Sequence, residues 1–251
     1  MTGEPAVIRS AANTQYKALR QLAQDNTAWR KQGRIWLEGD HLCRAALARG
    51  IQPELAVYAH SCLSRLGASR TLVIDDALFR GLSGLESPGA MGFVIAVPQA
   101  PVLDPGAATV ILDRLQDAGN VGSVLRSAAA FGFPQVIALK GTAALWSPKV
   151  LRAGMGAHFA LRLFDAADAG IVDGLRVPLV ATSSHQGDWL HAAKLPHPCA
   201  WMLGHEGQGL SPVLAQRAQQ HVRIAQPGGE ESLNVAAAAA ICLHASATQG
   251  P

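Results

Sequence analysis

Short apolar runs alternate with helical patterns along the second half of the chain. Uninterrupted apolar runs of strand length are typical of strands buried on both faces of a parallel sheet. The stretches between them have the pattern of helices that cover such a sheet. This half therefore predicts an α/β domain with a mostly parallel sheet. The predicted strands are 109–112, 135–139, 158–164, 177–181, 200–203 and 222–224, and the predicted helices are 121–131, 212–219 and 233–245.

The first hundred residues show the same alternation on a smaller scale. Residues 12–31 predict a helix with Leu19, Leu22 and Ala23 on its apolar face. Three prolines and a glycine between Pro98 and Gly106 then interrupt the pattern, as a linker does. We therefore expect one domain at 1–98, a linker at 99–106 and a second domain at 107–251. Within the first domain, strands are predicted at 35–37, 55–58, 71–74 and 92–97, and a helix at 41–48.

The small net charge of the chain, +3 over 251 residues, is unevenly placed. Residues 1–100 hold 11 Lys/Arg against 8 Asp/Glu, whereas residues 101–251 hold 10 of each. A polyanion would therefore bind the N-terminal part. A solvated helix face explains the same charges equally well. The candidate contacts in this part are Lys17, Arg20, Arg30 and Lys31.

Membrane segments and metal sites find no support in the composition. No apolar run approaches the roughly 20 residues that span a bilayer, and the first ten residues lack a signal-peptide core. These features predict a cytoplasmic protein without a membrane partner. Cysteines at 43, 62, 199 and 242 are scattered, so we expect free thiols rather than disulfides, and no metal site.

Two Gly-rich turns near the C-terminus are the strongest sign of a ligand site. The first, at 202–210, ends an apolar run and carries Glu206. Glycine at such a strand end lets the backbone approach a ligand closely. The second turn, at 224–235, delivers Ser232 and Asn234 onto the start of a helix, where N–H groups are unpaired. Ligands of parallel sheets bind beyond the carboxyl ends of the strands, so both turns predict one shared pocket.

A third motif follows the strand at 109–112. Asn120 occupies a natural N-cap position of the next helix. Gly122 and Arg126 lie four residues apart, hence on one helix face, where the guanidinium can pass the glycine to the pocket mouth. A surface helix with a capping asparagine and a solvated arginine is the alternative.

A fourth segment, at 147–159, predicts a phosphate contact. Lys149 and Arg152 share a helix face and form a candidate clamp near the same pocket. Gly154 and Gly156 are expected to end this helix. His158 is interpreted as an ordinary structural histidine at the start of a strand.

Several other chemistries lack their motifs. The sequence contains no phosphate-binding G-x-x-x-x-G-K-[ST] loop and no clean G-x-G-x-x-G after a strand. It also lacks a zinc-hydrolase histidine pair and a G-x-S-x-G turn. The neighbouring carboxylates Asp75 and Asp76, and Glu230 and Glu231, point apart, so they predict capping and surface charge rather than an acid/base pair.

Three of these motifs, in this order, resemble the SpoU/TrmH family of RNA ribose 2′-O-methyltransferases of the SPOUT superfamily. They are Asn120-x-Gly122-x-x-x-Arg126, the turn from Leu203 to Leu210, and the segment from Ser232 to Val235. The resemblance covers about 107–248. The first hundred residues resemble more loosely the small L30e-like substrate-binding domain of the family. The sequence departs from the family at Ala225 and Ala236, which changes pocket shape rather than a chemical group.

The resemblance implies a SPOUT α/β domain whose C-terminal segment threads a trefoil knot and binds S-adenosylmethionine. It further implies a homodimer acting on structured ribosomal or transfer RNA, with no DNA partner. The RNA contacts would be the four basic residues of the first domain together with Lys149 and Arg152. The implied cofactor contacts are Thr182, Leu203, Gly204, Gly209, Ile224 and Leu233. The implied catalytic residues are Asn120, Arg126, Glu206, Ser232 and Asn234.

Two other functions are weighed against methyl transfer. An RNA-bound protein that keeps the pocket without turnover would be free to lose one of the five residues, yet all five are present. A nucleotide-dependent oxidoreductase is disfavoured by the missing dinucleotide motif. For methyl transfer, the family resemblance implies that Arg126 is the base that activates the 2′-hydroxyl. A guanidinium with a pKa above about 12 is a poor base, so we favour alkoxide stabilisation or phosphate anchoring.

Overall fold

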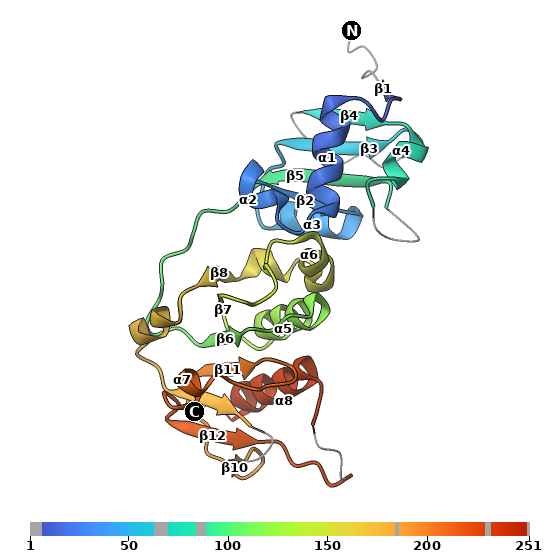
Figure 1. Cartoon of the computed structure of the whole chain (residues 1–251). Coiled ribbons are helices and arrows are strands. Elements are labelled where there is room, and N and C mark those ends of the chain that lie inside the picture. Colours follow the sequence, from blue (N-terminus) through green and yellow to red (C-terminus); the bar gives the residue numbers. More distant parts are fainter. Residues whose placement is uncertain (1–6, 63–69, 84–88, 184–185, 229–231, 250–251) are drawn as a thin grey trace. The chain divides into compact units, whose positions relative to one another are not determined.

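The computed structural model describes residues 7–62, 70–83, 89–183, 186–228 and 232–249. The chain divides into two compact units, and Figure 1 labels their elements. The first unit comprises 1–99 together with 146–159, and the second comprises 100–145 and 160–251. The main boundary thus falls where the predicted linker starts. The grouping of 146–159 with the first unit was not predicted.

A mixed five-stranded sheet forms the first unit, in the order β1-β4-β3-β5-β2. β4 is parallel to β1 and β3, and β5 is antiparallel to β2 and β3. Leu37, Val57 and Phe93 are fully buried in it, as the apolar runs predicted. The strands are β1 (Val7–Ile8), β2 (Arg34–Glu38), β3 (Leu55–Ala59), β4 (Thr71–Ile74) and β5 (Met91–Ala96). The helices are α1 (Thr14–Gln24), α2 (Ala28–Gln32), α3 (Asp40–Ala48), α4 (Asp76–Arg80), α6 (Pro148–Gly154) and the 3-10 turn η1 (Ala157–Ala160).

Two helices, α1 and α2, replace the single helix predicted over 12–31. Asn13 caps α1, whose apolar side buries Leu19 and Leu22. The carboxylate of Asp25 then accepts hydrogen bonds from the N–H and the hydroxyl of Thr27, both at 2.8 Å. Such local side-chain bonds compete with the helical ladder, which explains the break.

The segment 146–159 packs on the first unit through α6, which contacts α1 and β2. The Nη1 atom of Arg152 lies 3.4 Å from Oε2 of Glu38, whose side chain is only 4% exposed. Ser83 also donates a hydrogen bond to Glu38. A buried carboxylate needs such partners, so the Arg152–Glu38 pair helps to hold α6 in place. The predicted strand at 158–164 begins later, at Arg162, because η1 buries His158 against Trp146.

The second unit is built on a seven-stranded sheet, and all its strand pairs are parallel. The strand order is β10-β12-β9-β11-β6-β7-β8. The predicted parallel α/β domain is therefore confirmed, while the trefoil knot and the L30e-like character of the first unit stay predictions. The strands are β6 (Thr109–Asp113), β7 (Gln135–Leu139), β8 (Arg162–Ala167), β9 (Leu179–Thr182), β10 (Asp188–Trp189), β11 (Ala200–Gly204) and β12 (Gln220–Arg223). The helices are α5 (Ala118–Ala130), η2 (Ala169–Gly174), α7 (Pro212–Ala215) and α8 (Val235–Thr248).

Both faces of this sheet are covered by helices. Successive residues of β11 point to opposite faces and show what covers each one. The indole N–H of Trp201 donates to the hydroxyl of Ser246 in α8 at 2.8 Å, and α8 packs against α5 (Figure 1). Met202 faces the other way, into a core with Val172 of η2 and Leu214 of α7. No helix in the described ranges is both long and apolar enough to cross a bilayer.

The carboxyl ends of β6 and β11 lie level with each other. The two strands pair in register from Thr109 and Ala200 to Asp113 and Gly204. The turns after these strands, which carry two of the predicted motifs, therefore leave the sheet side by side. This edge is where a parallel sheet places its ligands.

Candidate active site

The first Gly-rich turn closes directly beyond β11. His205 and Gly209 exchange both backbone hydrogen bonds, at 2.8 and 3.0 Å. A Cβ atom on Gly204 would lie 2.1 Å from the carbonyl carbon of Gly209. The sequence predicted that this glycine makes room for a ligand. In the structure, glycine is needed at 204 for another reason: the backbone of the turn itself fills the space that a side chain would take.

Asp113 and Arg114 fasten this turn to the end of β6. The Oδ2 atom of Asp113 accepts a hydrogen bond from the N–H of Ser211 at 2.6 Å. The guanidinium of Arg114 donates to Oε1 of Gln208 at 3.1 Å and to the carbonyl of Gly209 at 3.3 Å. Arg114 has a φ of +62°, a left-handed conformation that non-glycine residues adopt at a cost of about 1–3 kcal/mol. The turn is thus held at three points.

Glu206, in the same turn, reaches across to the loop before α5. Its carboxylate accepts hydrogen bonds from the N–H groups of Gln116 at 3.3 Å and Asp117 at 3.1 Å, and from the amide of Asn120 at 3.2 Å. Partial burial opposes ionisation. The hydrogen bonds from backbone N–H groups and from Asn120 outweigh it and lower the pKa of Glu206 below its ordinary value. Glu206 is therefore ionised at neutral pH.

Asn120 continues this network to the second Gly-rich turn. Because its Nδ2 donates to Glu206, its Oδ1 is left to accept from Nδ2 of Asn234, at 2.9 Å. The Oδ1 of Asn234 in turn caps α8, accepting from two backbone N–H groups. Glu206, Asn120 and Asn234 thus form one chain of hydrogen bonds in which each amide has a fixed orientation.

The predicted N-cap position of Asn120 was wrong. Asp117 caps α5, and its Oδ1 accepts from the N–H of Asn120 at 2.7 Å. The helix therefore begins one turn earlier than the sequence pattern predicted. This earlier start leaves the Asn120 side chain available for Glu206 and Asn234, which a capping role would have prevented.

Arg126 and Ser232 differ from these three residues. Both are exposed, and no hydrogen bond or ion pair is present for either side chain among the described residues. Gly122, one turn before Arg126 on α5, is buried. Residues 229–231 of the second Gly-rich turn, including the predicted Glu230–Glu231 pair, lie outside the described residues. Asp75 caps α4, as predicted for the other carboxylate pair.

Comparison with known proteins assigns this arrangement to a family. The family model described as the SpoU rRNA Methylase family matches residues 107–244. The chain belongs to this family. An uncharacterized tRNA/rRNA methyltransferase of Synechocystis is 31% identical to it, over 99% of this chain and 96% of its own length.

Solved structures extend the likeness of this SpoU family member to the whole chain. A structure of an RNA 2′-O ribose methyltransferase is 31% identical, with a TM-score of 0.84, and the match covers 97% of this chain and 99% of that one. An AdoMet-bound rRNA methyltransferase from Sinorhizobium meliloti is 26% identical, with a TM-score of 0.84 and coverage of 97% and 98%. S-adenosylmethionine is the cofactor that the SpoU site must accommodate.

The ends of β9, β11 and β12 bring the predicted cofactor residues to one edge. Thr182 ends β9, and its hydroxyl donates to the carbonyl of Met202 at 3.2 Å. Leu203 is 1% exposed, so the whole residue is packed inside the protein. Ile224 follows β12 and is half-buried. Gly204 is buried, whereas Gly209 is exposed. Contact of these positions with the cofactor stays a prediction.

Two further features fit a nucleoside cofactor in this SpoU domain. The Oε1 atom of Gln226, two residues beyond Ile224, is a buried acceptor without a hydrogen-bond partner among the described residues. A ligand amino or hydroxyl group would satisfy such an acceptor. Leu233 is 40% exposed and offers an apolar cover for a flat ring. The residues present are therefore suited to S-adenosylmethionine.

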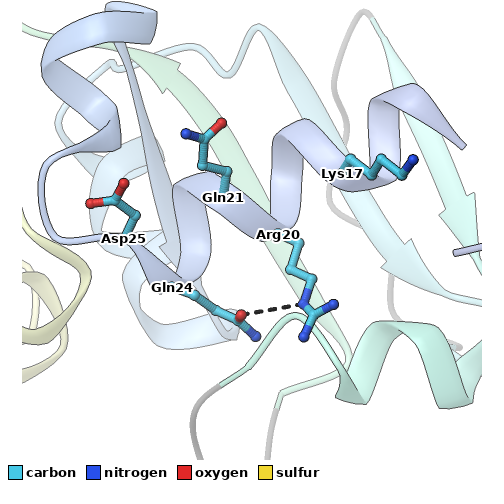
Figure 2. Close-up of a pocket in the computed structure, with 5 residues that line it drawn as sticks. All are labelled: Lys17, Arg20, Gln21, Gln24 and Asp25. Atoms are coloured by element: carbon cyan, nitrogen blue, oxygen red, sulfur yellow. Dashed lines mark hydrogen bonds between the residues drawn. The ribbon is translucent and has the colours of Figure 1, made fainter. Parts of the chain in front are cut away.

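The basic residues predicted to bind RNA lie in the first unit. Figure 2 shows Lys17, Arg20, Gln21, Gln24 and Asp25 along the outer side of α1, where they line a shallow depression of about 400 Å³. The Nε atom of Arg20 donates to Oε1 of Gln24 at 3.2 Å.

The other four predicted RNA contacts differ in how they are held. On α2, Lys31 is exposed and Arg30 stacks on the ring of Trp29 at 5.0 Å. On α6, Lys149 is exposed, whereas Arg152 already pairs with Glu38. The predicted clamp thus combines one solvated cation with one that has a partner. RNA contact at all six positions stays a prediction.

The cysteines of this SpoU protein are remote from such chemistry. All four are free, and Cys43, Cys199 and Cys242 are buried. Burial raises the pKa of Cys43 and of Cys242 to about 12 and that of Cys199 to about 11. These thiols therefore stay protonated at neutral pH and are not nucleophiles.

Sequence reasoning assigned no role to Asp113 and Arg114, although both belong to the third motif. Asp113 is 3% exposed, and a carboxylate buried at a strand end needs partners. The available signal was a charged pair at the end of an apolar strand, directly before a polar turn. Their partners, near Ser211, are almost a hundred residues away and leave no local pattern.

Proposed function

We propose that this protein transfers a methyl group from S-adenosylmethionine to the 2′-hydroxyl of a ribose in structured ribosomal or transfer RNA. The cofactor supplies an electrophilic methyl group on its sulfonium sulfur. The observation that carries the proposal is the hydrogen-bonded chain from Glu206 through Asn120 to Asn234. It joins three motifs at one sheet edge and provides a rigid, pre-organised support for a bound ribose.

Arg126 is the residue we assign to the reacting hydroxyl. Its exposed guanidinium has no protein partner among the described residues, so it is available to a substrate. Five N–H donors on a permanent cation suit it to stabilise the alkoxide that develops at the 2′-oxygen, or to anchor a flanking phosphate. Ser232, also exposed, would hold the substrate edge of the same pocket.

The working unit is a homodimer in this proposal. Supporting it, α8 keeps an exposed apolar side chain although the helix belongs to the core, since Ile241 is 41% exposed. A second copy of the second unit would cover this side chain. Light scattering of the purified chain measures this directly, and a monomer across the concentration range would contradict it.

The first unit supplies RNA affinity in this proposal. The basic excess of the sequence lies there, and Lys17, Arg20, Arg30 and Lys31 are all exposed. Residues 1–98 would bind the RNA and 107–251 would carry out methyl transfer, with 99–106 as linker. Ribosomal and transfer RNA are inferred as targets because the relatives from Synechocystis and Sinorhizobium meliloti are a tRNA/rRNA methyltransferase and an rRNA methyltransferase by name. We infer the cytoplasm as the place of action from the same substrates.

Methyl transfer to RNA tests the function. The purified full-length protein is incubated with methyl-labelled S-adenosylmethionine and total RNA from cells that lack the protein. We expect label in ribosomal or transfer RNA, at a ribose whose 3′ linkage then resists alkaline hydrolysis. Label on a base would contradict the ribose assignment. Cofactor binding without any incorporation, for wild type and for Arg126→Ala alike, would favour the RNA-bound protein without turnover.

A further inference from the structure

An exposed aromatic residue stands at the outer edge of the second unit and has no place in the site described above. Trp189 in β10 is 41% exposed, although tryptophan is a costly side chain to leave in water. The guanidinium carbon of Arg223 lies 3.7 Å from the centre of its ring, so one face of the indole is covered. The imidazole of His191 is nearly parallel, at 21°, but its centre is 6.4 Å away. This is an offset arrangement, and with both neighbours in place Trp189 is still 41% exposed, so part of the indole stays accessible to a ligand.

The position of this pair relates it to the candidate active site. Trp189 is in register with Arg223, the last residue of β12, and the next residue is the predicted cofactor contact Ile224. Continuing the strand registers by one or two residues places Trp189 on the same level as Gly204. β10 and β11 are three strand spacings apart, which is about 14 Å. Both sites therefore lie on the carboxyl edge of one sheet, and β10 is its outermost strand.

We propose that Trp189 and Arg223 form a stacking platform for an unpaired nucleobase of the RNA substrate, close to the methylated nucleotide. The open face of the indole takes the base. The guanidinium is planar, so stacking on Trp189 leaves N–H groups at its outer edge for the adjoining phosphate. Asp188 does not oppose this charge directly, because successive residues of a strand point to opposite faces. The proposal rests on the proposed function for the identity of the RNA.

An aromatic ring beside a guanidinium is a combination suited to binding single-stranded RNA. Bases that are not paired stack on aromatic side chains and on arginine planes, while cations hold the backbone. The cofactor also carries a base, adenine. Trp189 lies about 14 Å from Gly204 and on an open edge strand, which favours a base of the RNA over the adenine of the cofactor as the group that stacks on it.

Matched substitutions of Trp189 in the full-length protein test the platform. Trp189→Leu keeps an apolar cover over the edge strand but removes the π face, whereas Trp189→Phe keeps both. The probes are a short single-stranded oligoadenylate and an abasic oligonucleotide of equal length. We expect Trp189→Leu to weaken oligoadenylate binding by about 5- to 150-fold, with little change for the abasic probe, and Trp189→Phe to restore most of the affinity. Val213→Ala, another exposed apolar residue of the second unit, is the control and should change neither.

Methylation and cofactor-binding measurements distinguish failure of the stacking platform from failure of the proposed function. In methylation assays Trp189→Leu should raise KM for RNA and leave kcat and the Kd of S-adenosylmethionine unchanged. A weaker cofactor Kd without RNA would overturn the proposal in favour of an adenine contact. Absence of oligoadenylate binding by wild type, or equal affinities for all variants, would also overturn it while methyl transfer by wild type continued. Loss of methyl transfer in wild type itself would instead contradict the proposed function.

Discussion

Polar side chains are fixed by hydrogen bonds at the carboxyl edge of the seven-stranded sheet, whereas those on the outer face of α1 extend into solvent. At the sheet edge, Glu206, Asn120 and Asn234 bind one another and backbone N–H groups. On α1, Lys17 and Arg20 extend from exposed positions, and among the described residues the Arg20 side chain bonds only within its own helix. Positioning a reacting ribose requires fixed atoms, whereas a cation attracts phosphate over several ångströms. The difference supports our proposal that chemistry takes place on the first surface and electrostatic binding on the second.

Arg126, which we propose for the chemistry, resembles the cations of α1, since it is exposed and without a protein partner in the described ranges. Replacing it should therefore have the largest effect on activity with the smallest effect on the fold. We expect Arg126→Ala to lower kcat about 10²–10³-fold, the usual effect of losing one transition-state donor. Tm and the Kd of S-adenosylmethionine should not change. Activity within threefold of wild type would remove Arg126 from the chemistry.

Glu206 represents the fixed side of the comparison. In Glu206→Gln, the new amide cannot accept at both of its ends, so either Asn120 or a backbone N–H loses its partner. We expect kcat to fall about 10- to 100-fold, whereas Glu54→Gln in the first unit should have no effect on it. Since the folded pKa of Glu206 is lowered, wild type should keep its network at neutral pH and lose it only as the pH falls through that lowered pKa. Equal activity of both variants would show that the chain does not position the substrate.

The turn that carries Glu206 offers a stability test with its own control. A Cβ on Gly204 meets backbone at 2.1 Å, while a Cβ on Gly207 meets only the His205 ring, at 3.8 Å. Gly204→Ala should therefore reduce the free energy of unfolding by about 1–3 kcal/mol, and Gly207→Ala should change it much less. Denaturant unfolding measures both. Similar values for the two variants would mean that the turn is not closely packed.

The cations of α1 should give the smallest effect, and one of a different kind. Lys17→Ala combined with Arg20→Ala removes two candidate phosphate contacts, so the slope of log affinity against log salt should fall by roughly 1.5. The kcat at saturating RNA should be unchanged. Lys194→Ala, an exposed lysine of the second unit, serves as the control. An unaltered salt slope would place the RNA on another surface.

The sequence predicted the sheet edge better than the contacts that organise it. Apolar runs located β6 and β11, because burial on both faces leaves a local signature in the sequence. The capping role of Asp117 was missed, since Asn120 caps equally well by propensity and only its partner Glu206 distinguishes them.

Contacts between distant parts of the chain account for the other differences. The pair of Arg152 with Glu38 joins residues more than a hundred positions apart, which no periodic pattern records. The short strand β10, with Trp189, was missed because two residues are too few to show an alternation. Local patterns thus predict elements, whereas the partners of polar side chains depend on the completed fold.

The hydrogen-bonded chain at the sheet edge also determines when a newly made protein gains its site. Asn120 meets Glu206 across 86 positions of sequence and Asn234 across 114. Such distant contacts form late, because long loops must close first. Until α8 has docked, Asn120 therefore lacks its partner Asn234, and the proposed support for the ribose is incomplete.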